Sequence, residues 1–183
     1  EAGQLMREGF NSHGIGLFNN SLQSVRDRKG VGIPVTFLRR KVFTCRTFDE
    51  AERLLLSSKR CVSNNMLLGS KEGRAIDIEA HPDGCDTIGP VEGIVTHANH
   101  FEVTPALNAL EDSPRAARLR WLLLAKRGAM TVDYIKKSMC DHENYPKAIC
   151  RHPSDVGKPL SRRDMTVAGL IIDFHEAAMH ICA

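Results

Sequence analysis

An amide and two imidazoles stand within four consecutive residues at the end of an apolar stretch, as His97, Asn99 and His100. An asparagine held at a strand end can aim its N–H at the negative charge that develops on a carbonyl oxygen during acyl transfer, so Asn99 is a candidate oxyanion donor. Two other interpretations stay open. The imidazoles could join His81 or Cys85 around a metal, although the spacing is not a zinc signature. The three side chains could also only satisfy backbone groups where the strand ends.

Three further segments offer weaker chemical signals. Asn20 could present a second amide to the same oxyanion, although asparagine is also common in turns. Ser161 and Arg162 precede an apolar run, and the arginine could clamp a carboxylate or steady a nucleophile, or belong to a solvated basic turn. His142 and Cys150 could form a Cys–His nucleophile pair, but nearness in sequence does not show spatial pairing, and a structural loop is favoured. No cofactor motif is recognised, and we expect no cofactor and no bound metal.

The elements that must position these residues begin with strands. Residues 8–22 predict two strands joined by a turn at 11–14, where glycines interrupt the apolar pattern. Residues 64–69 and 74–80 predict a hairpin. In its second strand Asp77 and Glu79 alternate with apolar residues, which predicts one buried face and one wet face. The apolar stretch from Ile94 to Phe101 predicts a further strand.

Helices are expected in two pairs. Pro34 opens the first, and Thr47 caps the second with Glu50 three residues later, which is a capping box. A third helix starts at Ser113–Pro114, and a fourth is capped by Thr131 and runs to about residue 140.

Two further features complete the prediction of the fold. The arginines of the third helix, Arg115, Arg118 and Arg120, are assigned to its wet face. The almost wholly apolar stretch Met165–Phe174 predicts a strand buried on both faces. Runs of strands and runs of helices together favour an α+β fold.

Composition sets the broad class. The chain has 183 residues, of which 42% are hydrophobic and 26% charged, as in a soluble globular domain with one core. A net charge of +3 without a basic run gives no reason to expect nucleic acid, and no apolar stretch reaches the roughly 18 residues of a membrane span. Six cysteines without a CxxC pair suggest reduced, mostly buried thiols in a cytoplasmic protein. Both ends look abrupt, so we expect residues 1–183 to be one partial domain.

Several of these segments, in chain order, resemble the acyl-CoA:6-aminopenicillanic-acid acyltransferase family, which is peptidase family C45 of the Ntn-hydrolase superfamily. The H-x-N-H motif and the N-Y-P…I-C-R motif are specific in combination, and the match covers nearly the whole chain. The matching segments are 1–3, 9–14 with 20–22, 96–100, 143–146 with 149–151, and 161–162 followed by 166 and 170–173.

The resemblance implies a four-layer αββα Ntn-hydrolase sandwich, here incomplete at both ends. It also implies an N-terminal cysteine, exposed by autoproteolysis, that attacks an amide or thioester with its own α-amino group as base. The acyl-enzyme then passes to water or to an amine. The resemblance carries the oxyanion asparagine onto Asn99 and a Ser–Arg pair onto Ser161 and Arg162. The spacing after Ser161 is one residue longer than in the family pattern, so Arg163 could replace Arg162.

A looser match to bile-salt and penicillin V hydrolases places the second oxyanion contact at Asn20. The implied partners are a small-molecule amide or acyl-thioester substrate and an N-terminal segment that carries the nucleophile. That cysteine falls upstream of the match at Glu1, and none of the six internal cysteines stands at a free N-terminus. We therefore expect residues 1–183 alone to be inactive. The alternative is a degenerate, non-catalytic family member that binds small acyl compounds.

Overall fold

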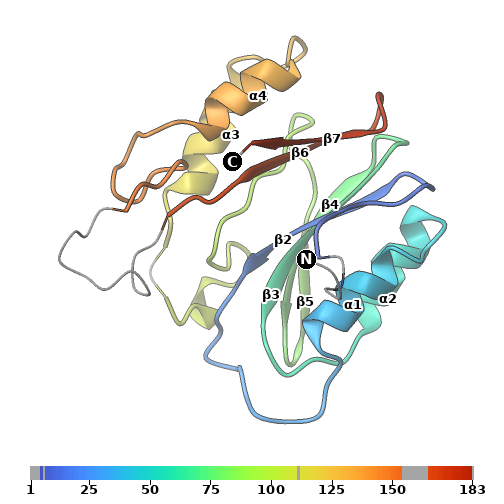
Figure 1. Ribbon diagram of the computed structural model, residues 1–183. Coiled ribbons are helices and arrows are strands. Elements are labelled where there is room, and N and C mark those ends of the chain that lie inside the picture. The colour runs from blue at the N-terminus through green and yellow to red at the C-terminus, as the bar shows by residue number, and fades with distance from the viewer. Residues whose placement is uncertain (1–4, 6, 111, 154–164, 183) are drawn as a thin grey trace.

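The computed structural model describes residues 5, 7–110, 112–153 and 165–182. Its helices and antiparallel strands follow one another in runs, which confirms the α+β class (Figure 1). In chain order the elements are β1 (Gly9–Phe10), β2 (Ile15–Ser21), α1 (Val35–Val42), α2 (Phe48–Ser57), β3 (Asn64–Ser70), β4 (Ala75–His81), β5 (Gly84–Ile88), the short helix η1 (Pro105–Leu107), α3 (Arg115–Leu124), α4 (Val132–Met139), β6 (Gly169–Asp173) and β7 (Ala178–Cys182).

Five strands form one antiparallel sheet in the order β1-β2-β3-β4-β5. The register pairs Leu17 with Leu68 and Met66 with Ile78, and all four side chains are fully buried. Because successive residues of a strand point to opposite faces, these apolar positions define one face of the sheet and the residues between them define the other.

Helices α1 and α2 cover the apolar face of this sheet. Their inward side chains, Leu38, Val42, Ala51 and Leu55, join the residues of the sheet in one buried cluster. Burial of this many aliphatic side chains is the main force that holds the first half of the chain together, because each contributes on the order of 1.5–3 kcal/mol.

The local sequence signals of this half are confirmed. The Thr47 hydroxyl accepts the N–H of Glu50 at 3.2 Å, and the Glu50 carboxylate accepts the N–H of Arg46 at 2.8 Å. The turn between β1 and β2 closes through the bond from the N–H of Gly14 to the carbonyl of Asn11. Gly14 has φ +78°, a conformation that glycine adopts without strain.

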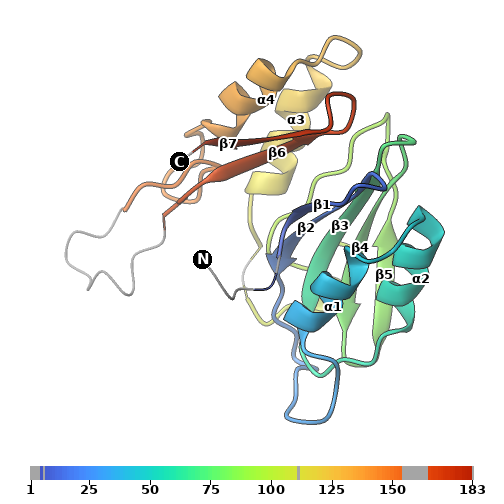
Figure 2. The same ribbon diagram turned by 45° about the vertical axis from the view of Figure 1, so that its right-hand side comes forward.

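The second half of the chain packs on the other face of the sheet. Strands β6 and β7 form a two-stranded ribbon, and Phe174 beyond β6 meets Phe10 edge to face at 6.2 Å. A Cβ atom on Gly16 would lie 2.6 Å from the Phe174 ring, so glycine at this position lets the ribbon approach β2. Figure 2 shows α1 and α2 on one side of the five-stranded sheet, with the ribbon, α3 and α4 on the other.

Two strand predictions are wrong in part. Ile94–Phe101 is irregular apart from a bridge between Ile94 and Val91. Its later residues cross the face of the sheet and form no ladder with a strand of the described chain. In Met165–Phe174 only β6 is a strand, and its five residues are half-buried rather than covered on both faces. Strands β5 and β7 were not predicted.

The expectation of mostly buried cysteines is also wrong, since Cys45 alone is buried and two of the six are exposed. No disulfide joins them. Among the described residues, no helix is both long enough and apolar enough to cross a bilayer.

Candidate functional site

Four polar side chains lie side by side across the face of the sheet that is turned away from α1 and α2. They are Asn20, Asn65, Glu79 and Asp86, one each from β2, β3, β4 and β5, and the strand register pairs each with the next. We call them the polar row. Neighbours in such a row stand about 5 Å apart, so a segment that crosses the sheet can contact all of them.

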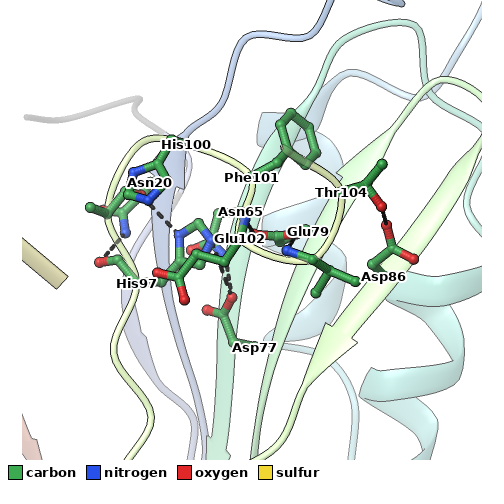
Figure 3. A network of polar contacts seen from close by, with 12 residues as sticks. Asn20, Asn65, Asp77, Glu79, Asp86, His97, His100, Phe101, Glu102 and Thr104 are labelled. Carbon is green, nitrogen blue, oxygen red and sulfur yellow. Dashed lines mark hydrogen bonds and ion pairs between the residues drawn. The ribbon is translucent and has the colours of Figure 1, made fainter. Parts of the chain in front are cut away.

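Residues 96–104, the covering loop, cross the polar row (Figure 3). His97 Nε2 lies 2.7 Å from Glu79 Oε1, and the other Glu79 oxygen accepts the N–H of Val103 at 3.1 Å. Glu79 also accepts the N–H of Glu102, and the Thr104 hydroxyl donates to Asp86 at 2.9 Å. The loop thus shuts Glu79 away from water.

Burial and pairing set the charges beneath this loop. Burial raises the pKa of Glu79, but the bonds from His97 and from two backbone N–H groups outweigh it and hold the pKa below its ordinary value. Burial lowers the pKa of His97, and the bond to Glu79 and the charge of Asp77 more than offset it, so the pKa is raised. His97 Nε2 therefore lies beside two carboxyl groups, 2.7 Å from Glu79 Oε1 and 3.8 Å from Asp77 Oδ2, and both favour the protonated imidazole.

Asp77, on the same face of β4, is the carboxyl group whose charged form is disfavoured by burial. Burial raises its pKa to about 6, against the opposing effects of His97 and of the bond from Asn65. Its Oδ1 is buried without a partner in the described part of the chain. The prediction that Asp77 and Glu79 lie on a wet face is wrong, because both are fully buried by the covering loop.

The two candidate oxyanion donors are brought together by a reciprocal pair of hydrogen bonds. Asn20 Nδ2 donates to the carbonyl of His97 at 3.2 Å, and Asn99 Nδ2 donates to the carbonyl of Ser21 at 2.9 Å. Each bond joins the end of β2 to the covering loop, so the side chains of Asn20 and Asn99 approach from opposite sides of the same junction.

A third contact fixes how the Asn99 amide points. Arg115 Nη2 donates to Asn99 Oδ1. Because a guanidinium has only donors and a carbonyl has only acceptors, Arg115 must face the amide oxygen and Ser21 must face the amide nitrogen. The orientation of the Asn99 amide is therefore defined by both neighbours.

The arginines of α3 were assigned to a wet face, and that prediction is wrong. Besides the bond from Arg115, Arg118 makes a two-point contact with Asp141 at 3.1 and 2.7 Å, and Arg120 donates to the carbonyl of Ile94 at 3.1 Å. Two residues along a helix correspond to a turn of about 200°, so Arg118 and Arg120 lie on nearly opposite sides of α3. The helical pattern therefore places the three arginines on no common face, and it does not show which acceptors they meet.

The remaining predicted residues have different outcomes. Ser161, Arg162 and Arg163 lie outside the described residues. The metal hypothesis around the covering loop is not supported in the described chain, because His97 engages Glu79 and His100 accepts the N–H of Ser113 at 3.2 Å. Its other suggested ligands, His81 and Cys85, are bonded to the N–H of Asp83 and the carbonyl of Leu56.

A cavity of about 400 Å³ lies between the covering loop and α3. Thr96, Phe101, Ala116 and Arg120 are among the residues that line it. This volume falls within the range of about 300–1,000 Å³ that is usual for small-molecule sites.

The family model described as acyl-coenzyme A:6-aminopenicillanic acid acyl-transferase matches residues 2–183. No curated protein sequence matches the chain.

Proposed function

Because the chain belongs to the acyl-coenzyme A:6-aminopenicillanic acid acyltransferase family, we propose that it carries the oxyanion side of a site that cleaves amides or thioesters through a cysteine acyl-enzyme. The acyl group then passes to an amine or to water. The observation that carries this proposal is the orientation of Asn99 by Arg115 and by the carbonyl of Ser21.

The proposed role of Asn99 follows from its remaining donor. An amide nitrogen has two N–H groups, and the bond to Ser21 uses one of them. The second N–H is the one that we assign to the carbonyl oxygen of the substrate. Since Arg115 and Ser21 fix the amide before any substrate binds, little reorganisation is needed as charge develops, which is the condition under which such donors are most effective. The second N–H of Asn20 is assigned to the same oxyanion.

The attacking thiol is proposed to come from outside residues 1–183. Cys45 belongs to the core beneath α1 and α2, and Cys85 bonds to the carbonyl of Leu56 in α2. Cys140, Cys150 and Cys182 line a separate cavity beside β6. In the described part of the chain, the hydrogen bonds of the Asn20 and Asn99 side chains go to backbone carbonyls and to Arg115, and none goes to a cysteine.

The proposal extends to the complete fold, to the Ser–Arg pair and to the way in which the thiol is exposed. The order of α1 and α2, the five-stranded sheet, the ribbon, and then α3 and α4 supports a four-layer αββα sandwich that further segments would complete. Ser161 and Arg162, which lie outside the described residues, are assigned to the steadying of the thiol. Autoproteolytic exposure of that thiol is part of the same proposal.

The proposal is tested by acyl-enzyme trapping. The 183-residue chain and a longer protein that includes the upstream segment are each incubated with a set of acyl-CoA thioesters, quenched in acid and analysed by intact-protein and peptide mass spectrometry. We expect an acyl adduct on the N-terminal cysteine of the longer protein and no turnover by the 183-residue chain.

Two results would contradict the proposal. Turnover by residues 1–183 that disappears when one internal cysteine is replaced would put the nucleophile inside this chain. Binding of acyl compounds by the longer protein without any adduct or turnover would identify a non-catalytic member of the family.

A further inference from the structure

The loop that follows α4 brings two imidazoles and a thiol together at a place remote in sequence from the covering loop. His142, Cys150 and His152 each offer one ligand atom, and the three atoms lie within 4.8 Å of one another. His142 Nε2 and His152 Nε2 are 2.7 Å apart, and Cys150 Sγ is 3.9 Å from His152 Nε2. Three side chains of the types that bind metal ions therefore lie within reach of one another.

The loop is closed at its base, which holds the three ligands in place. Asp141 is bound by Arg118 of α3, and its carbonyl accepts the N–H of Cys150 at 3.0 Å. On the far side, the N–H of Arg151 donates to the Thr166 hydroxyl at 2.9 Å, and the N–H of Thr166 donates back to the carbonyl of Arg151 at 3.0 Å. His142 and the Cys150–His152 pair thus face each other across a fixed junction.

We propose that His142, Cys150 and His152 bind one Zn²⁺ ion. Imidazole nitrogen and thiolate sulfur are the ligands that zinc prefers in proteins, and three protein ligands with a water molecule as the fourth form a known class of tetrahedral site. The donors belong to one short loop and to no part of the polar row, so the site is separate from the proposed acyl-transfer site.

The distances fit a tetrahedral zinc ion after a small adjustment. Zinc bonds of about 2.05 Å to nitrogen and about 2.3 Å to sulfur require about 3.3 Å between the two nitrogens and about 3.6 Å between nitrogen and sulfur. The two imidazoles must therefore separate by about 0.6 Å, and the thiol must approach His152 by about 0.3 Å. The thiol must also come to about 3.6 Å from the His142 ligand atom, and it already lies within 4.8 Å of that atom. His142 and His152 are exposed, so their rings can make this movement without repacking the core.

Room for the fourth ligand exists beside the site. Cys150 and His152 also line a cavity of about 330 Å³ between the end of α4 and β6, which can admit a water molecule. Bound zinc would join the beginning of the loop after α4, at His142, to its later part, at Cys150 and His152. We therefore expect it to stabilise the folded chain, by a factor of about 100 in the ratio of folded to unfolded protein when free Zn²⁺ is 100 times its Kd.

The test is metal titration of the tag-free protein after removal of metal with a chelator. Isothermal titration calorimetry with Zn²⁺ measures stoichiometry and affinity, and Co²⁺ titration reports a thiolate-to-cobalt absorption band in the near ultraviolet. We expect one equivalent of Zn²⁺, at least tenfold weaker binding in Cys150→Ser and in His142→Asn, and loss of the cobalt–thiolate band in Cys150→Ser. Zinc binding must also weaken as the pH falls, because the thiol and the imidazoles lose their protons on binding.

Cys140→Ser is the matched control, because Cys140 borders the same cavity but is not one of the three ligands. Its zinc affinity is expected to stay at the level of the unmodified protein. Circular dichroism and urea midpoints of the metal-free variants check that each is folded, and His152→Asn replaces any variant that is not. Absence of one-to-one binding would overturn the proposal, as would affinity unchanged in the ligand variants or lost equally in Cys140→Ser.

Discussion

Replacement of Asp77 by asparagine should change how the stability of the protein depends on pH. The Asp77 carboxyl is fully buried, and its pKa is raised from an ordinary 3.8 to about 6, chiefly by burial. Between these two values the folded state binds the proton that the unfolded state has released. The free energy of unfolding therefore falls as the pH rises through this window, and it stays low above pH 6. Asparagine resembles the protonated carboxyl and cannot ionise, so Asp77→Asn lacks this loss.

The magnitude follows from the shift of the pKa. A shift of roughly two units corresponds to about 3 kcal/mol in total, of which about 2.5 kcal/mol accrues between pH 4 and pH 8. The stability of Asp77→Asn relative to the unmodified protein should therefore rise by about 2.5 kcal/mol from pH 4 to pH 8. A comparison of the two pH values cancels the difference in shape between asparagine and a protonated aspartate.

The assay is urea unfolding of both proteins at pH 4, 6 and 8, with the free energy obtained by linear extrapolation. Asp83→Asn is the control, because Arg28 bonds to this exposed carboxylate and holds its pKa below the ordinary value. Asp83 stabilises the fold above its unfolded pKa and loses this effect only below about pH 4, so its variant should stay nearly parallel to the unmodified protein from pH 4 to pH 8. If Asp77→Asn runs parallel to the unmodified protein from pH 4 to pH 8, the covering loop does not bury an ionisable Asp77.

Three further changes test how the chain is held together, each by urea unfolding. Glu79→Gln should cost about 3–5 kcal/mol, because it removes the buried carboxylate that pairs with His97 and with two backbone N–H groups. Glu176→Gln in an exposed turn should stay within about 0.5 kcal/mol, and equal effects of the two changes would contradict the buried pair. Gly16→Ala should cost about 1–3 kcal/mol, because the added Cβ would clash with the Phe174 ring. In the double variant with Phe174→Leu, part of that loss should be recovered. If the effects of the two changes on the free energy of unfolding were simply additive, the ribbon would not pack against β2 at this point. Thr47→Ala should cost about 1 kcal/mol by removal of the helix cap, and an unchanged urea midpoint would contradict the cap.

Local signals in the sequence predicted local structure well. The capping box at Thr47 and the turn before Gly14 depend on residues within four positions of each other, and both are present. The hairpin of β3 and β4 also follows from short-range alternation. These features need no information about the rest of the chain.

The burial of residues by segments distant in sequence was not predictable in the same way. Alternation in β4 shows that Asp77 and Glu79 share a face, but it does not show that a loop 20 residues further on will bury them. In the same way, the apolar composition of Ile94–Phe101 indicates burial without specifying strand pairing. This segment instead gives its carbonyls to side chains, as Arg120 and Asn20 demonstrate.

The residues of the candidate site also separate into those that the sequence predicted and those that only long-range contacts reveal. Residue type and resemblance singled out Asn99 and Asn20, and the structure places them at one junction although they are 79 positions apart. Nothing in the sequence marked Arg115 as the residue that orients Asn99, because its helix pattern predicted a solvated position. Ser161 and Arg162 stay predictions, as does the cytoplasmic location.

The most direct test of the account is the turnover number of Asn99→Asp in the protein that includes the proposed nucleophile segment. This change keeps the size and the oxygen that faces Arg115 but removes both N–H donors of the amide. We expect kcat for an acyl thioester to fall by about 10²–10³-fold with little change in KM, while Asn144→Asp in an exposed loop keeps the unmodified rate. A kcat for Asn99→Asp within about threefold of the unmodified protein would show that this amide does not stabilise the oxyanion.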